Sequence, residues 1–431
     1  MGSPVDIVSV AGWLRDRGRL EQIGGALQLA DATPAVAHVE EHARQVVKKW
    51  RMRRLIAVCQ KVAAEAYGDV GDVDEFIASA ELALMGVASN LDDDQTPTLG
   101  EAIVERIDDI VAGRAAVGGI GTGLDDLDRQ LGKMLHCNFV VLVPHSGIGK
   151  SSLAMQVGVH VATHWALDPA SAKPMLCTVL ACSMEMSRAE LADRAALASL
   201  SLDTSKAARN MLTDEEKASL AGLAAKIRSR GVLSTMLVDD RGNLTPQQVR
   251  AAARRAAARG RREGAPLRLA IVDYLQLCDG AQGGRGSERR EREVSFIAEQ
   301  MKALAKELRI VVLGVAQLNE DARTANRLPR GEDLRESKSI RAHADKVILL
   351  HNESALARRT AAQDEGAPRE LGAEVVDIIV DKNRGVPEGS VCVSFWPSTS
   401  SFGPCSGLDA REHRAARQAR EEARSGVGRD R

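Results

Sequence analysis

The residues best suited to chemistry stand together in the run Ser146-Gly147-Ile148-Gly149-Lys150-Ser151-Ser152. A branched apolar segment precedes this run and an amphipathic segment follows it, which is the strand–loop–helix arrangement of a phosphate-binding loop. In such a loop, backbone N–H groups and the helix N-terminus together hold an anion. Lys150 would reach the β- and γ-phosphates of a nucleotide, and the Ser151 hydroxyl would bind Mg²⁺.

One position departs from the strict pattern of such loops. Pro144 stands where the pattern has Gly, and proline has no N–H to donate to a phosphate. A Gly-rich turn between an ordinary strand and an ordinary helix is the alternative interpretation of this stretch.

Two charged residues follow a second predicted strand. Glu185 comes directly before a helix that Ser187 would cap, where a general base could orient water at a γ-phosphate. The alternative is a carboxylate favoured by the helix dipole. Arg194, one or two turns further along, could face the same end and contact a nucleotide, or could be an ordinary solvated arginine.

Two more polar side chains end apolar strands. Asp273 closes the run Leu267–Asp273, and a carboxylate in such a place is costly unless it meets a cation. Mg²⁺ would supply that cation, although an arginine or backbone N–H groups could do so instead. Gln317 ends the strand that begins near Ile310, where it could sense a γ-phosphate or simply cap the strand.

Three loops carry features used in nucleic-acid or nucleotide contacts. Arg335 and Lys338 lie in the polar loop 333–340, and cations on a loop suit phosphodiester binding. Lys382 and Arg384 alternate near a tight turn, where an arginine finger could reach a neighbouring nucleotide. The Gly-rich loop 280–287 could line a nucleic-acid channel. An ordinary surface loop is the alternative in each case.

The elements that must position these residues form an α/β pattern. Strands alternating with helices predict a mainly parallel sheet covered on both faces, with antiparallel strands added at the end. Ligands bind such sheets beyond the carboxyl ends of the strands. The predicted strands are 139–143, 175–181, 234–238, 269–272, 310–315, 346–350, 375–380 and 390–395.

Composition shifts predict four parts of the chain. Residues 1–91 form a helical domain, and 92–118 a linker with an amphipathic helix at 101–112 that Thr98 caps. The apolar stripe of that helix needs a surface to dock on, such as that of a neighbouring subunit. Residues 119–402 form the α/β domain, and 403–431 a polar, disordered tail.

The composition restricts the class of protein. The 431 residues are 44% apolar and carry a net charge of -1, so any nucleic-acid contact must come from a local patch or an assembled ring. Seven scattered cysteines argue against a zinc site or a disulfide framework. Since no apolar run is long enough to span a bilayer and no signal peptide opens the chain, we expect a cytoplasmic protein.

Six motifs together carry a resemblance to one family. The chain resembles the DnaB-like replicative DNA helicases, whose motor is a RecA-like fold, over residues 119–402. The upstream helical block resembles the later part of the family's N-terminal domain, which is shortened here. The motifs, in order, are Gly147-Ile-Gly-Lys-Ser151, Ser183-Met-Glu-Met-Ser187, Asp273-Tyr-Leu-Gln-Leu277, Gln317-Leu-Asn319, Asp333-Leu-Arg-Glu-Ser337 with Ala344-Asp345, and Lys382-Asn-Arg-Gly385.

The resemblance implies a homo-hexameric ring that encircles single-stranded DNA, moves 5′ to 3′ with ATP and Mg²⁺, and works with a primase and a helicase loader. It implies that Glu185 is the catalytic base, that Asp273 binds the metal with Ser151, and that Arg194 and Gln317 contact or sense the nucleotide. Lys382 and Arg384 would act on the adjacent subunit's nucleotide. The implied DNA-binding residues are Arg335, Glu336 and Lys338.

Two departures from the family accompany these motifs. Lys338 stands where the family usually has Gly, and Arg341-Ala-His343 replaces the usual Glu-Gln-Asp. Two alternative functions stay open at this point. One is a recombinase-like or loader-like ATPase that binds DNA without unwinding it. The other is a scaffold without turnover.

Overall fold

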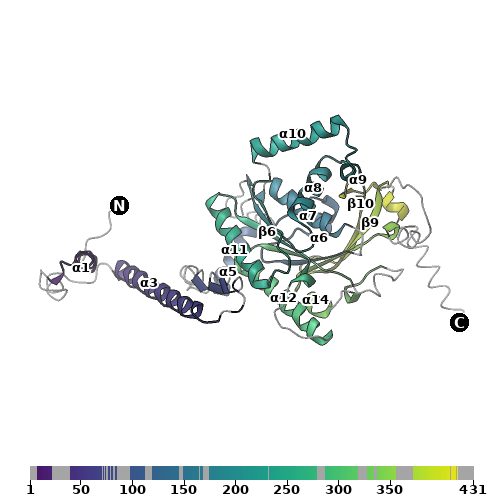
Figure 1. Cartoon of the computed structure of the whole chain (residues 1–431). Coiled ribbons are helices and arrows are strands. Elements are labelled where there is room, and N and C mark those ends of the chain that lie inside the picture. The colour runs from purple at the N-terminus through teal and green to yellow at the C-terminus, as the bar shows by residue number, and fades with distance from the viewer. Residues whose placement is uncertain are drawn as a thin grey trace. The chain divides into compact units, whose positions relative to one another are not determined.

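The structure is a computed structural model with two compact units, Met1–Pro97 and Thr98–Arg431 (Figure 1). It describes residues 7–21, 39–69, 71, 73, 76–77, 79–80, 83–84, 98–111, 119–144, 149–164, 166–167, 174–231, 233–278, 287–318, 328–333, 337–355, 372–407, 409–413 and 415. Each unit is considered by itself below.

The first unit is helical where it is described. Helix α1 spans Ile7–Asp16 and α3 spans Val39–Ala66. Several large apolar side chains of α3 are exposed, among them Val46, Trp50 and Ile56. The prediction of a helical block therefore holds for these two segments.

Helix α5, Leu99–Val111, opens the second unit. The Thr98 hydroxyl accepts a hydrogen bond from the Glu101 N–H, and the Glu101 carboxylate accepts one from the Thr98 N–H, which is a capping box. Ile103 and Ile107 on its apolar stripe are about half exposed. The predicted cap is confirmed, and the stripe remains uncovered by the described residues of this chain.

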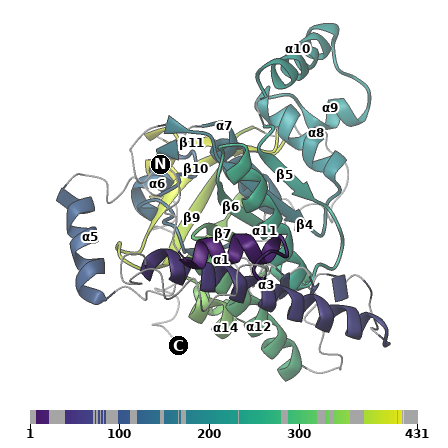
Figure 2. The same cartoon turned by 90° about the vertical axis from the view of Figure 1, so that its left-hand side faces the viewer.

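A nine-stranded sheet organises the second unit (Figure 2). Its order is β11-β10-β9-β8-β1-β7-β6-β4-β5, with parallel pairing from β8 to β5 and antiparallel pairing from β8 to β11. The strands are β1 Phe139–Pro144, β4 Thr178–Ser183, β5 Met236–Asp239, β6 Leu267–Asp273, β7 Val311–Val315, β8 Lys346–His351, β9 Glu374–Asn383, β10 Gly389–Trp396 and β11 Ser401–Pro404.

Helices cover both faces of the sheet. Successive side chains of the central strands point to opposite faces, and both sets are therefore buried. Val140 and Leu142 of β1 belong to the core under α6 (Asp125–Leu131) and α7 (Lys150–Thr163). Phe139, Val141 and Val143 belong to the core under α11 (Pro246–Arg262) and α12 (Ser287–Leu308). The remaining helices are α8 Arg188–Ser199, α9 Thr204–Ala208, α10 Asp214–Arg230 and α14 Ser337–His343, with 3-10 turns at Leu275–Leu277 and Gly331–Asp333.

The eight predicted strands are all present, and the mixed sheet is confirmed. Three further strands were not predicted, namely β11 and the short pair β2 (Ala166–Leu167) and β3 (Pro174–Met175). Two-residue strands leave no alternating pattern to detect. Among the described helices, none is both long and apolar enough to cross a membrane.

The structure differs from the expected polar tail at its beginning. Residues 409–413 are helical, Ala410 is buried, and His413 Nε2 lies 2.9 Å from the buried Asp377 Oδ2 of β9. The first part of the tail therefore packs on the sheet, and residues 416–431 lie outside the described part.

Candidate active site

Four predicted site residues follow four neighbouring strands. Ser151 follows β1, Gln317 follows β7, Asp273 ends β6 and Glu185 follows β4, and these strands are consecutive in the sheet. Because the four strands are parallel, their carboxyl ends meet at one edge. The structure therefore brings together residues that are up to 166 positions apart in the sequence, from Ser151 to Gln317.

The phosphate loop ends in a left-handed glycine. Gly149 has φ +75° and precedes the first residue of α7, Lys150. A Cβ at Gly149 would lie 3.0 Å from the Phe395 ring, so a larger residue would be both strained and crowded. Residues 145–148, which include three of the predicted phosphate ligands (Ser146, Gly147 and Ile148), lie outside the described residues, as does the side chain of Lys150.

The two serines after Lys150 are buried at the start of α7. Ser151 is 3% exposed and Ser152 is 7% exposed. Within the described part of the chain, the Ser152 hydroxyl is buried and has no hydrogen-bond partner. A buried hydroxyl without a partner costs free energy unless a ligand supplies the missing hydrogen bond. This observation fits a bound nucleotide at the end of β1.

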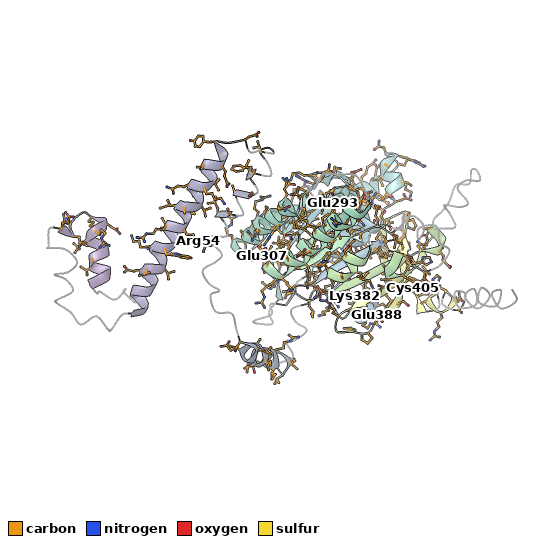
Figure 3. The ribbon with its side chains drawn as sticks, turned by 90° about the horizontal axis from the view of Figure 1, so that it is seen from below. Arg54, Glu293, Glu307, Lys382, Glu388 and Cys405 are labelled. Atoms are coloured by element: carbon orange, nitrogen blue, oxygen red, sulfur yellow. The ribbon has the colours of Figure 1, made fainter. Side chains whose placement is uncertain are left out.

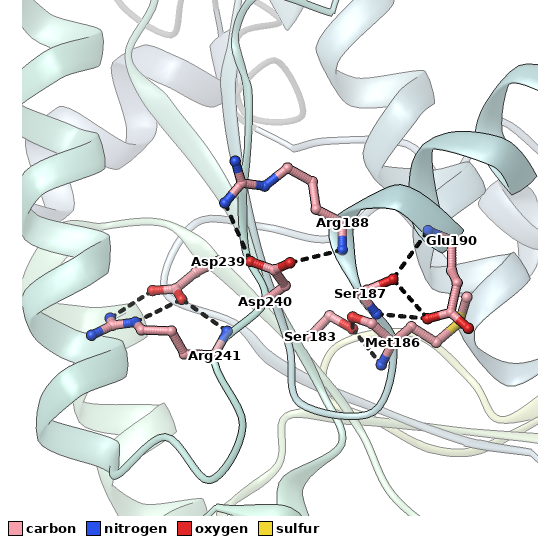
Figure 4. Close-up of polar contacts among 8 residues, drawn as sticks. All are labelled: Ser183, Met186, Ser187, Arg188, Glu190, Asp239, Asp240 and Arg241. Carbon is pink, nitrogen blue, oxygen red and sulfur yellow. Dashed lines mark hydrogen bonds and ion pairs between the residues drawn. The ribbon is translucent and has the colours of Figure 1, made fainter.

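The segment that carries Glu185 is held on both sides (Figure 4). The Ser183 hydroxyl donates to the Met186 carbonyl oxygen over 2.8 Å, and a capping box joins Ser187 to Glu190. Beyond the cap, Asp240 accepts hydrogen bonds from the backbone N–H and guanidinium of Arg188. Glu185 itself is exposed, so its carboxylate stands at the edge of the sheet on an anchored turn.

Asp273 lies beside this segment. It pairs in register with Ser183, and its carbonyl oxygen accepts from the Met184 N–H over 2.9 Å. Asp273 is 5% exposed, whereas Gln317, just after the strand β7 that lies between β1 and β6, is half-buried. The carboxylate therefore stands about two strand spacings, or about 10 Å, from the end of β1.

A cavity of about 660 Å³ opens next to the two serines. Ser151, Ser152 and Arg194 contribute to its wall, together with Trp396 and Phe402 from the antiparallel end of the sheet. Arg194, on α8, thus lines the same cavity as the two serines at the start of α7. The cavity has the size of a small-ligand site and an aromatic rim.

The cation pair lies at the other edge of the sheet. Arg384 Nη1 is 3.1 Å from Asp345 Oδ1, and Asp345 also accepts from the N–H of Phe139, the first residue of β1. Figure 3 labels Lys382 and, in the turn after β9, Glu388. Since β1 is six residues long, Arg384 is about 20 Å from the carboxyl end of β1 in its own chain.

Asp345 was not predicted to have an individual role, although it belongs to the Ala344-Asp345 motif. It is 4% exposed, and Lys302 Nζ lies 2.5 Å from its Oδ2. The available signal was an acidic residue directly before an apolar strand, which gives no hint of which cations it meets.

The predicted DNA-binding residues are only partly described. Arg335 and Glu336 lie outside the described residues, and so does most of the Gly-rich loop, 279–286. Lys338 lies in α14, where its backbone is helical. The segments on either side of Arg335 and Glu336 are described and contact β9.

Comparison with known proteins decides the family. The DnaB-like helicase C terminal domain matches residues 119–404. The chain belongs to the DnaB-like helicase family. "Replicative DNA helicase DnaB" of Leifsonia xyli is 30% identical over 408 residues, covering 93% of this chain and 82% of that protein. "Replicative DNA helicase DnaC" of Bacillus subtilis is 26% identical, covering 93% of this chain and 83% of the relative.

Solved structures agree with this DnaB-like fold. A structure titled "The Structure Of A DnaB-Like Replicative Helicase And Its Interactions With Primase" has a TM-score of 0.62 at 22% identity, covering 94% of this chain and 88% of that one. A second solved structure, of an isolated ATPase domain, has a TM-score of 0.58 at 23% identity, covering 72% of this chain and 100% of that one. The predicted RecA-like fold, helicase family and nucleotide use are thereby confirmed.

Proposed function

We propose that this DnaB-like chain is a hexameric motor that hydrolyses ATP, moves 5′ to 3′ on single-stranded DNA and unwinds duplex DNA at a replication fork. One observation carries the proposal. Ser151, at the carboxyl ends of the parallel strands, and Arg384, at their amino ends, lie at opposite edges of the same sheet, so a chain cannot bring its own Arg384 to its ATP site. A ring, in which each protomer presents one edge to the next, brings both halves together.

The residues at the carboxyl edge have distinct roles in this proposal. Lys150 and the loop from Ser146 to Gly149 hold the β- and γ-phosphates. Glu185 accepts a proton from the attacking water, and Gln317 senses the γ-phosphate. From the neighbouring protomer, Arg384 and Lys382 stabilise the negative charge that develops on the transferred phosphoryl group.

Ser151 and Asp273 provide the donors for Mg²⁺. A serine hydroxyl and a carboxylate are the oxygen ligands that this ion prefers, and it usually completes its shell with phosphates and water. Among the described residues, no cluster of three or more His, Cys, Asp or Glu could hold a metal ion alone. This donor set fits an ion that arrives with the nucleotide. When bound, Mg²⁺ would neutralise charge on the phosphate oxygens.

The cavity beside Ser151 fits the nucleoside part of ATP. Arg194 lies on its wall near the phosphate loop, while Trp396 and Phe402 offer apolar surface for a base. Arg335 and Glu336, before α14, and Lys338, in its first turn, would contact the DNA backbone. We propose a primase and a helicase loader as partners by analogy with the family.

A fork-unwinding assay tests the proposal directly. Wild type should unwind a fork with a 5′ tail only when ATP is present, and Lys150→Ala and Glu185→Gln should both abolish unwinding. Electron microscopy with an ATP analogue and an oligonucleotide should show closed rings. Filaments on DNA without unwinding would favour a recombinase-like ATPase instead, and a complete lack of ATP turnover would favour a scaffold.

A further inference from the structure

Strand β9 contains a β-bulge at Asp381. Its pairing with β8 passes from Val347–Lys382 to Ile348–Val380, so Asp381 is the additional residue. A bulge re-aims the side chains next to it and commonly lies close to a functional site. Here the result is that Asp381 and Lys382, which follow one another in the strand, both contact α14.

The Asp381 carboxylate joins two segments of the chain. Its Oδ1 accepts from the Gly331 N–H over 2.9 Å, and its Oδ2 accepts from Arg341 Nε over 3.0 Å. Gly331 precedes Arg335 and Glu336 in the sequence, and Arg341 follows them. The Asp381 side chain therefore binds a residue on each side of the segment that carries the proposed DNA contacts.

The fit at Gly331 is close. A Cβ on this residue would lie 2.2 Å from Asp381 Oδ2 and 2.8 Å from Arg341 Nε. Any other side chain would push Asp381 and Arg341 apart. The three groups thus form one compact contact that only glycine permits at position 331.

Lys382 extends this contact to the end of α14. Its ammonium group donates to the carbonyl oxygen of Arg341 over 2.6 Å and to that of Ala342 over 3.4 Å. Burial, followed by the nearby charges of Arg384 and Arg341, lowers the pKa of Lys382. The backbone and side chain of Arg341 are therefore both held by consecutive residues of β9.

We infer that Asp381, through its ion pair with Arg341, is a positioning residue that couples DNA contact to the Lys382–Arg384 pair. A displacement of Gly331 or Arg341 on binding DNA would therefore shift the bulge, and with it Lys382, whose ammonium group is held by the end of α14. Arg341 replaces the Glu usual in the family, and Asp381 supplies the opposite charge that this replacement needs. The inference rests on the proposed function.

A role in stability alone explains the Asp381–Arg341 pair less well than a coupling role does. The Arg341 side chain is 45% exposed in its pair with Asp381, and exposed ion pairs contribute little to folding. The contacts lie instead between two functional segments, which is where a coupling element belongs.

The test compares ATP hydrolysis with and without saturating oligo-dT in Asp381→Asn, in Arg341→Gln and in the double variant. Asn at 381 keeps an acceptor for the Gly331 N–H but loses the charge that holds Arg341. We expect DNA stimulation to fall at least fivefold in each single variant, while the rate without DNA and the Kd for oligo-dT stay within twofold. Since both changes break one interaction, the double variant should be no worse than the more affected single variant.

The matched control is Asp126→Asn, which breaks the exposed pair between Asp126 and Arg129 (2.6 Å) on α6 and should leave stimulation unchanged. Undiminished stimulation in the single variants would overturn the inference, as would an equal fall of both rates, which would mark a purely structural role. A wild type whose hydrolysis ignores DNA would overturn the proposed function and this inference together.

Discussion

Arg384 Nη1 lies 3.1 Å from Asp345 Oδ1 at the amino edge of the sheet, with the arginine side chain 60% exposed and the carboxylate buried. The pair holds the guanidinium at the edge without enclosing it. An arginine in this state can reach a phosphate on a neighbouring protomer at little cost, because an exposed ion pair is weak.

Mixing two inactive variants should restore ATP hydrolysis. An Arg384→Ala chain keeps the catalytic base Glu185, and a Glu185→Gln chain keeps the arginine finger Arg384. In a ring mixed at random from equal amounts of the two, about one subunit junction in four would therefore have both an intact base and an intact finger. We expect each variant alone to be nearly inactive and the mixture to regain a measurable fraction of the wild-type rate. The measurement is steady-state phosphate release after subunit exchange. A mixture as inactive as its components would refute the shared site.

Glu185→Gln should separate nucleotide binding from hydrolysis. The substitution keeps the size of the side chain and its anchored turn but removes the base, which is worth about 10²–10⁴ in rate. We expect kcat to fall by that factor while the Kd for a fluorescent ATP analogue changes less than about threefold. Glu190→Gln on the same turn is the control. An unchanged kcat would mean that another group activates the water.

Asp345→Ala should destabilise the motor far more than Arg384→Ala. Loss of the buried carboxylate leaves the Phe139 N–H without its acceptor and Lys302 without its negative partner, with the Cys137 carbonyl oxygen still accepting from Lys302, which costs about 3 kcal/mol. Loss of the exposed Arg384 costs less than about 1 kcal/mol. Urea unfolding of both variants measures the difference. Equal effects would show that Asp345 serves only the finger.

Much of the fold was predictable because the central strands of the motor are apolar and buried. The run from Phe139 to Val143 and the run ending at Asp273 each predict a central parallel strand, and both are present. Residues that end such strands meet at one edge whatever the order of the strands. Their spatial order was not predictable, because β7 lies between β1 and β6 although it follows both in sequence.

The contacts at the amino edge escaped prediction for a different reason. Asp381 contacts Gly331 and Arg341, which are 50 and 40 positions away, and it does so through a bulge that leaves no mark in the hydrophobic pattern. Asp345 meets Lys302 and Arg384 across similar distances in sequence. A charged residue has many possible partners of opposite charge in the sequence, and only tertiary packing selects among them.

His136 should make the stability of the motor depend on pH. Burial, together with the positive charges of Arg268 and Arg309, lowers its pKa from 6.5 to about 4. As pH falls below 6.5, the unfolded chain therefore takes up a proton that the folded chain does not. The free energy of unfolding should decline between pH 7 and pH 5, by roughly 1–2 kcal/mol for this residue once the partial exposure of the ring is allowed for.

The measurement is urea unfolding at pH 7, 6 and 5 for the wild type and His136→Asn. Because the variant lacks the titrating ring, its stability should decline less over this range, by roughly the 1–2 kcal/mol assigned to His136. Parallel curves for wild type and His136→Asn would show that His136 is protonated in the folded chain as readily as in the unfolded one.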